Sequence, residues 1–114
     1  VTMSMIVAFL PPGRRERVAL RLHALPGFPG MTVSEARGHG HEKGQDDQDS
    51  RSERTGYTPT VRIEIVVPDE FVEPIMSTIY EAAHTGERGD GKVYVLPVSD
   101  ALRIKTGQRG GDAM

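Results

Sequence analysis

The fold is decided by the stretch Val61-Arg62-Ile63-Glu64-Ile65-Val66-Val67-Pro68-Asp69. Apolar residues at positions 61, 63, 65 and 67 alternate with Arg62 and Glu64, and this period of two predicts a strand with one buried face. Pro68 ends the strand, because proline has no N–H to donate to a sheet. Asp69 is a favourable N-cap for a helix. The stretch therefore predicts a strand that leads directly into a helix.

The residues after Asp69 predict that helix and one more strand. Thr85-Gly86 places a glycine where helices commonly end, and the apolar run from Lys92 to Leu96 has the composition of a strand. The apolar residues that share one helical face are Val72, Ile75, Met76, Ile79 and Ala83.

The first part of the chain repeats the same order. Met3 to Leu10 is an apolar strand that stops at Pro11-Pro12-Gly13. An amphipathic helix follows, with apolar residues at i, i+4 and i+7, and Pro26-Gly27 closes it. Alternation from Met31 predicts a short second strand that ends at Gly38. The apolar positions of the helix are Val18, Leu22 and Leu25.

The predicted order is strand, helix, strand, long loop, strand, helix, strand. We therefore expect an α+β fold, a ferredoxin-like βαββαβ sandwich whose antiparallel sheet has two helices on one face. With 114 residues the chain fits a single domain, 1–114. Because its own helices cover only one face of the sheet, the other face needs a partner, and an oligomer is expected.

Composition excludes several classes of protein. The absence of cysteine excludes disulfides, thiolate metal sites and cysteine nucleophiles. Fourteen Lys and Arg against 16 Asp and Glu give a net charge of -2, so the basic surface of a nucleic-acid binder is missing. No apolar run approaches the roughly 20 residues of a membrane span, and no Ser-His-Asp or H-E-x-x-H pattern is present. We expect a cytoplasmic protein that is not an enzyme.

A glycine-lysine loop carries the clearest chemistry. Gly86-Glu87-Arg88-Gly89-Asp90-Gly91-Lys92 fits G-x-x-x-x-G-K, but Val93 replaces the Ser or Thr that binds Mg²⁺, and the loop runs from helix to strand. A P-loop NTPase is therefore excluded. Glycines still let several N–H groups converge on an anion, and Lys92 adds a charge. Arg103 and Lys105, two apart on a strand-like stretch, would point the same way. The alternative is a plain turn with solvated charges.

These residues resemble the PII signal-transduction proteins. The similarity extends over nearly the whole chain apart from the long loop, with several separate motifs in register. The stretches that carry it are Pro29 to Glu35, Gly38-His39-Gly40, Val61 to Asp69, Thr85 to Val95 with Val98, and Arg103-Ile104-Lys105-Thr106-Gly107. The resemblance implies a homotrimer that binds ATP or ADP in clefts between subunits, without catalytic apparatus, and presents a T-loop to a membrane transporter or a metabolic enzyme.

The resemblance also implies a role for each matching residue. The T-loop spans about 39–58, the B-loop about 85–92 and the C-terminal segment 103–114. The B-loop residues Gly89, Asp90, Gly91 and Lys92 would cradle phosphate, Arg103 and Lys105 would reach phosphates from a C-terminal strand, Thr32, Gly38 and Gly40 would line the adenine and ribose, and Val66 would lie near the base. The family has arginine at the position of Lys105, so contact there is reduced to a point charge.

Three departures from the family pattern indicate a divergent PII-like member. His41 and Glu42 stand where the family usually has Arg and Gln, and that Gln helps to hold Mg²⁺ between ATP and 2-oxoglutarate. Glu42 could still bind Mg²⁺, but it would repel the 2-oxoglutarate carboxylates. Thr60 replaces a lysine that pairs with 2-oxoglutarate just before the third strand. The tyrosine that is uridylylated in many members is missing, and Tyr57 lies too close to the strand to replace it.

We therefore expect 2-oxoglutarate sensing to be altered or absent, no uridylylation, and ADP or AMP to compete well with ATP. Two alternatives remain open: a carbon-metabolism protein that responds to bicarbonate and adenylate state, and a metal-responsive protein. For the second, His39 and His41, with Glu42, could bind Zn²⁺, Cu²⁺ or Ni²⁺. The competing interpretation is that a polar loop carries two solvated histidines. His23 and His84 are expected at the surface or at helix ends.

Overall fold

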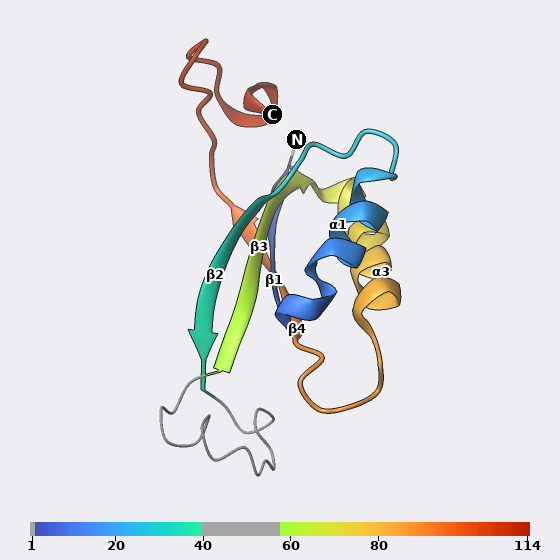
Figure 1. The fold of residues 1–114 in the computed structure, drawn as a ribbon. Coiled ribbons are helices and arrows are strands. Elements are labelled where there is room, and N and C mark those ends of the chain that lie inside the picture. The colour runs from blue at the N-terminus through green and yellow to red at the C-terminus, as the bar shows by residue number, and fades with distance from the viewer. Residues whose placement is uncertain (1, 40–57) are drawn as a thin grey trace.

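Four antiparallel strands form one sheet in the order β2-β3-β1-β4, and two helices lie on one of its faces (Figure 1). This is a computed structural model, and it describes residues 2–39 and 58–114. The elements are β1 (Met3–Leu10), η1 (Pro12–Arg14), α1 (Arg15–His23), β2 (Thr32–Gly38), β3 (Thr58–Pro68), η2 (Asp69–Phe71), α3 (Val72–Ala83), β4 (Lys92–Val98) and η3 (Gly110–Ala113). The predicted α+β, ferredoxin-like arrangement is confirmed.

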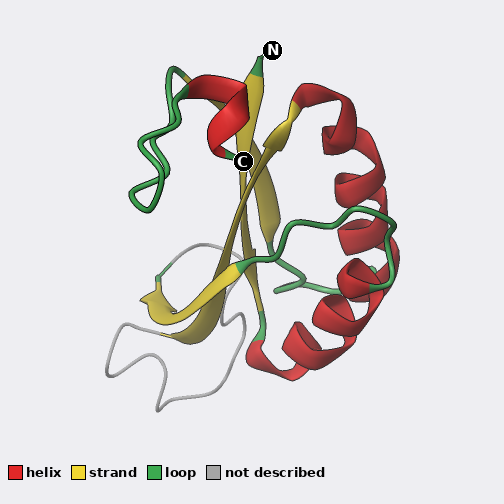
Figure 2. Cartoon of the chain, turned by 90° about the horizontal axis from the view of Figure 1, so that it is seen from above, coloured by secondary structure: helices red, strands yellow, loops and turns green. Residues whose placement is uncertain are grey.

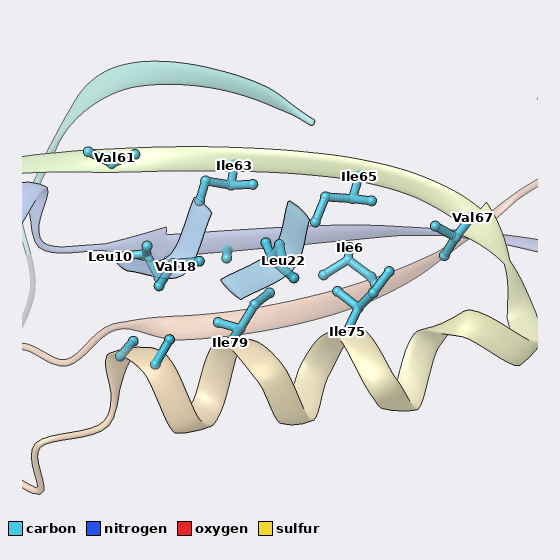
Figure 3. Close-up of a cluster of buried hydrophobic side chains, with 13 residues drawn as sticks. Ile6, Leu10, Val18, Leu22, Val61, Ile63, Ile65, Val67, Ile75 and Ile79 are labelled. Atoms are coloured by element: carbon cyan, nitrogen blue, oxygen red, sulfur yellow. The ribbon is translucent and has the colours of Figure 1, made fainter. Parts of the chain in front are cut away.

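The register of the strands explains the buried face. β1 pairs with β3 so that Ile6 lies opposite Ile65 and Leu10 opposite Val61. Since side chains alternate across a strand, every second residue of β1 and β3 faces the helices. These side chains, together with Val18, Leu22, Ile75 and Ile79 from the helices, form the hydrophobic core (Figure 3). The alternation read from residues 61–67 therefore predicted the correct face.

Asp69 does not cap the helix, contrary to the sequence prediction. Its carboxylate accepts hydrogen bonds from the hydroxyls of Thr2, at 2.6 Å, and Ser4, at 2.7 Å. The start of β1 lies beside the end of β3, which brings these donors to Asp69, and the 3-10 turn η2 begins at Asp69 and precedes α3. The hydrogen bond from Thr2, and next the one from Ser4, lowers the pKa of Asp69. Asp69 therefore joins two strand ends.

The second face of the sheet is not covered by α1 or α3, which both lie on the other side of the strands (Figure 2). Val66, Tyr94 and Leu96 are 36%, 49% and 41% exposed there. Arg62 and Glu64 form an ion pair on this face, with a distance of 2.7 Å from Nε to Oε2. We call this surface the open face, and it agrees with the prediction that the helices cover one side only.

Among the described residues, no helix is both long enough and apolar enough to cross a lipid bilayer.

Candidate functional site

The glycine loop, residues 86–91 between α3 and β4, is held in shape by the carboxylate of Asp90, which is part of the loop. Asp90 accepts hydrogen bonds from the backbone N–H of Thr85, at 2.8 Å, from the Thr85 hydroxyl, at 2.5 Å, and from the backbone N–H of Gly86, at 2.9 Å. These hydrogen bonds lower the pKa of Asp90, and the one from the Thr85 hydroxyl contributes most. Asp90 was predicted as part of a phosphate cradle, and the structure gives its carboxylate a positioning role within the loop.

Two glycines in this loop have conformations that other residues rarely adopt. Gly89 has φ +88° and Gly91 has φ +104°. A Cβ at Gly89 would meet nothing within 4 Å, whereas a Cβ at Gly91 would lie 1.9 Å from the carbonyl oxygen of Phe9. The loop therefore passes so close to the end of β1 that only glycine fits at position 91.

A hollow of about 320 Å³ lies beside the glycine loop. It is open on the helix side of β4, and apolar side chains form most of its wall. Lys92, the first residue of β4, stands at its border and is exposed. The lining residues are Leu10, Met76, Ile79, Tyr80, Ala83, His84, Asp90, Gly91, Lys92 and Val93. The hollow provides an apolar surface next to a cation.

The C-terminal cations do not lie on a strand, contrary to the sequence prediction. A single bridge joins Leu102 to Arg109, and residues 104–106 form a turn. The carbonyl of Arg103 accepts the N–H groups of Thr106, at 3.3 Å, and Gly107, at 2.7 Å. The strand-like reading failed because Thr106 and Gly107 turn the chain back after only three residues. Side chains two residues apart share a face only in a strand, so the prediction that Arg103 and Lys105 point the same way loses its basis.

The two groups of residues predicted to bind phosphate, the glycine loop with Lys92 and the pair Arg103 and Lys105, lie apart within one chain. Lys92 pairs with Phe9 at one end of β1, whereas Val98 pairs with Met3 at the other end. The glycine loop precedes Lys92, and the C-terminal segment follows Val98, so the two lie at opposite ends of the sheet (Figure 1). Within one chain, the structure therefore does not bring the two groups together.

The residues predicted to line the adenine and ribose lie toward the other edge of the sheet. Thr32 begins β2, Gly38 ends it, and Val66 lies in β3. In the strand order β2-β3-β1-β4, β1 lies between both of these strands and β4, so these residues are separated from β4, which the glycine loop precedes, by at least one strand. The predictions for Gly40, His41 and Glu42 lie outside the described residues.

Thr60 lies within β3, and not before it as the sequence suggested. It is 8% exposed, and its hydroxyl donates to the carbonyl of Leu10 at 3.0 Å. The strand begins at Thr58 because Gly38 and Arg37 of β2 pair with residues 58 and 59. Thr60 therefore joins two strands and adds no cation to the surface.

The histidine predictions have different outcomes. His23 is the last residue of α1 and His84 follows α3, both exposed, as predicted. The Nδ1 of His84 lies 3.8 Å from Oδ2 of Asp90. Residues 2–39 and 58–114 contain no group of three or more His, Cys, Asp or Glu that could hold a metal ion. His39 is described and exposed, but His41 and Glu42, its predicted co-ligands, are not described.

We expect the folded protein to lose stability in acid. Three carboxyl groups have a pKa below the ordinary value of 3.8 because they accept hydrogen bonds. The main donors are Thr2 for Asp69, Thr85 for Asp90 and Arg109 for Asp100. Since the unfolded chain binds these protons first, the stabilisation is complete above the ordinary pKa and is lost as pH falls through the lowered values. Urea unfolding from about pH 7 to pH 3 measures this, and Asp69→Asn should flatten the decline. Equal stability across that range would contradict the prediction.

Comparison with known proteins agrees with the geometry. The family described as "Nitrogen regulatory protein P-II" matches residues 3–108. Nitrogen regulatory protein P-II of Azospirillum brasilense is 42% identical over 113 residues, which cover 98% of this chain and 100% of that protein. The protein of the same name from Nostoc punctiforme is 39% identical over 113 residues, with the same coverage.

A solved structure supports the same conclusion. The crystal structure of Arabidopsis thaliana PII bound to citrate matches with a TM-score of 0.81 and 38% identity, and covers 99% of this chain and 92% of the plant chain. The fold and the sequence both match over nearly the whole chain, as the resemblance predicted. The chain therefore belongs to the P-II family of nitrogen regulatory proteins, whose members are signalling regulators and not enzymes.

Proposed function

We propose that this protein binds ADP or ATP in clefts between the subunits of a homotrimer and controls a target protein through the segment 39–58. One observation carries the proposal: within one chain, the glycine loop lies at one end of the sheet, and the segment with Arg103 and Lys105 follows the other end. A phosphate ligand can use both groups only where the C-terminal segment of one subunit reaches the glycine loop of another.

The glycine loop fits a phosphate chemically. Gly89 and Gly91 have positive φ, a conformation in which the backbone N–H groups of a turn can converge on one anion. Converging N–H groups form an anion-binding concavity. Lys92 adds a positive charge at the same place, and no ion pair within residues 2–39 and 58–114 engages its side chain. The loop therefore suits the oxygens of a diphosphate or triphosphate.

The open face suits a contact between subunits. Val66, Tyr94 and Leu96 are large apolar residues that remain exposed in the single chain. Met5 lies between Val66 and Leu96 in the register of the sheet, so the apolar surface crosses three strands. Burying such a surface against other copies is favourable. A trimer closed on this face would also bring each C-terminal segment to a neighbour.

Calorimetry on the purified protein tests the nucleotide proposal. ADP and ATP should bind to a protein whose mass in solution is that of a trimer, with ADP close to ATP in affinity. A protein that binds no adenine nucleotide at about millimolar concentration would contradict the proposed function, though not the fold.

We expect 2-oxoglutarate to add little to nucleotide binding. Thr60 is buried and bonded to Leu10, so this position cannot supply the cation that the family uses for a 2-oxoglutarate carboxylate. Repeating the ATP and Mg²⁺ titration with saturating 2-oxoglutarate should change the Kd for ATP by less than about threefold, below 1 kcal/mol of coupling. Citrate, present in the plant structure, serves as a second carboxylate control. A tenfold gain in ATP affinity with 2-oxoglutarate would contradict this expectation.

A further inference from the structure

The segment after β4 folds back on itself as an arm, residues 100–110. The backbone N–H of Arg103 donates to the carbonyl of Gln108 at 2.9 Å, and that of Gly110 donates to the carbonyl of Ala101 at 3.0 Å. The bridge between Leu102 and Arg109 lies between these two hydrogen bonds. The arm therefore has a base at residues 100–101 and 109–110 and a tip between them, and it extends away from the sheet (Figures 1 and 2).

The base of the arm is closed by one carboxylate. Oδ2 of Asp100 accepts from Nε of Arg109, at 3.1 Å, and from Nη2 of the same guanidinium. Oδ1 of Asp100 accepts from the backbone N–H groups of Ala101, at 2.8 Å, and Gly110, at 3.2 Å. We call this arrangement the Asp100–Arg109 clamp. It fastens the beginning of the arm to its end.

The tip carries the cations that the clamp leaves available. Arg103 and Lys105 are exposed, and within the described ranges no hydrogen bond or ion pair involves their side chains. Ile104 between them is 91% exposed. Arg109 differs, because its guanidinium is committed to Asp100. The arm therefore presents two of its three cations outward and uses the third to hold its own shape.

We infer that the Asp100–Arg109 clamp positions Arg103 and Lys105 for the nucleotide phosphates bound by the glycine loop of a neighbouring subunit. This inference rests on the proposed function, because the phosphates are those of the proposed ligand. Asp100 and Arg109 are positioning residues here, and neither needs to touch the nucleotide.

The physical reason is conformational entropy. An arm that is open at its base would sample many conformations, and binding would have to order both its backbone and the two long side chains. The clamp orders the backbone before the ligand arrives. The guanidinium matters in particular, because its rigid planar group donates from Nε and Nη2 to the Asp100 carboxylate in one fixed geometry, whereas the ammonium of a lysine rotates freely on a flexible stem.

The test compares variants of the clamp in the full-length trimer. Asp100→Ala removes the acceptor for all four hydrogen bonds, and Asp100→Asn keeps an acceptor for the backbone N–H groups but loses the charge. We expect Asp100→Ala to weaken ADP and ATP binding about tenfold and Asp100→Asn to lie between it and the wild type. The amides of Arg103 and Gly110 should exchange with deuterium faster in the same order. The matched control is Arg21→Gln, which breaks the exposed Arg21–Glu81 pair between the helices and should change neither result.

A double-mutant cycle separates positioning from a general structural effect. In a background of Arg103→Ala with Lys105→Ala, Asp100→Ala should cost less than threefold further, because the groups that it positions are gone. A full tenfold further loss in that background, or unchanged affinity of Asp100→Ala in the wild-type background, would overturn the inference and leave the proposed function standing. A wild-type protein that binds no nucleotide would overturn both.

Discussion

Gly91→Ala is expected to destabilise the protein by more than about 4 kcal/mol, or to prevent folding, because the new Cβ would overlap the carbonyl oxygen of Phe9. This Cβ would lie 1.9 Å from the backbone oxygen of Phe9, and β1 is paired with a strand on each side, so that oxygen cannot move aside. The φ of +104° at this position adds strain for any residue with a side chain. Urea unfolding at fixed protein concentration measures the loss.

Gly89→Ala is the matched control for this prediction. It lies in the same loop, has a similar positive φ of +88°, and its Cβ would meet nothing within 4 Å. Its cost should therefore be that of the backbone conformation alone, about 1 to 2 kcal/mol. If both variants unfold at the same urea concentration, the close approach to Phe9 has no energetic meaning and the prediction is wrong.

The fold could be predicted from the sequence because its signals are local. Alternation in residues 61–67 and the apolar face of the second helix each fix which side chains are buried, and the structure places Ile63, Ile65, Ile75 and Ile79 together in one core. Asp69 was placed wrongly for the opposite reason. Its donors, Thr2 and Ser4, are more than sixty positions away in the chain, and no local pattern indicates them.

The site was predicted less completely than the fold. The motif identified the glycine loop, but the hydrogen bonds that hold Asp90 within it depend on the turn that joins α3 to β4. A threonine five residues before an aspartate in a helix-to-strand turn was the signal available. The roles of Asp100 and Arg109 were missed because an acid and a base nine residues apart indicate nothing until the arm has folded back.

A site shared between subunits predicts a specific result for mixed trimers. Lys92→Ala removes the cation of the glycine loop, and Arg103→Ala with Lys105→Ala removes the cations of the arm. Each variant alone, as a homotrimer, should bind ADP and ATP at least tenfold more weakly, since charged hydrogen bonds to phosphate are among the strongest. Neither change touches the buried core, so the unfolding transition should be close to that of the wild type.

Co-expression of the two variants under different affinity tags should restore binding. Around a ring of three subunits that contains both variants, one interface pairs an intact glycine loop from the arm-deficient subunit with an intact arm from the Lys92→Ala subunit. Each purified mixed trimer should therefore bind one nucleotide with nearly the wild-type Kd, whereas remixing tags on a single variant should restore nothing. If both groups acted on a ligand within one chain, every subunit of the mixed trimer would still lack one of them, and affinity would stay at the level of the variants. Lys92 and Val98 pair with opposite ends of β1, so the two groups lie at opposite ends of the sheet in one chain. Restored binding in the mixed trimer is therefore the expected result.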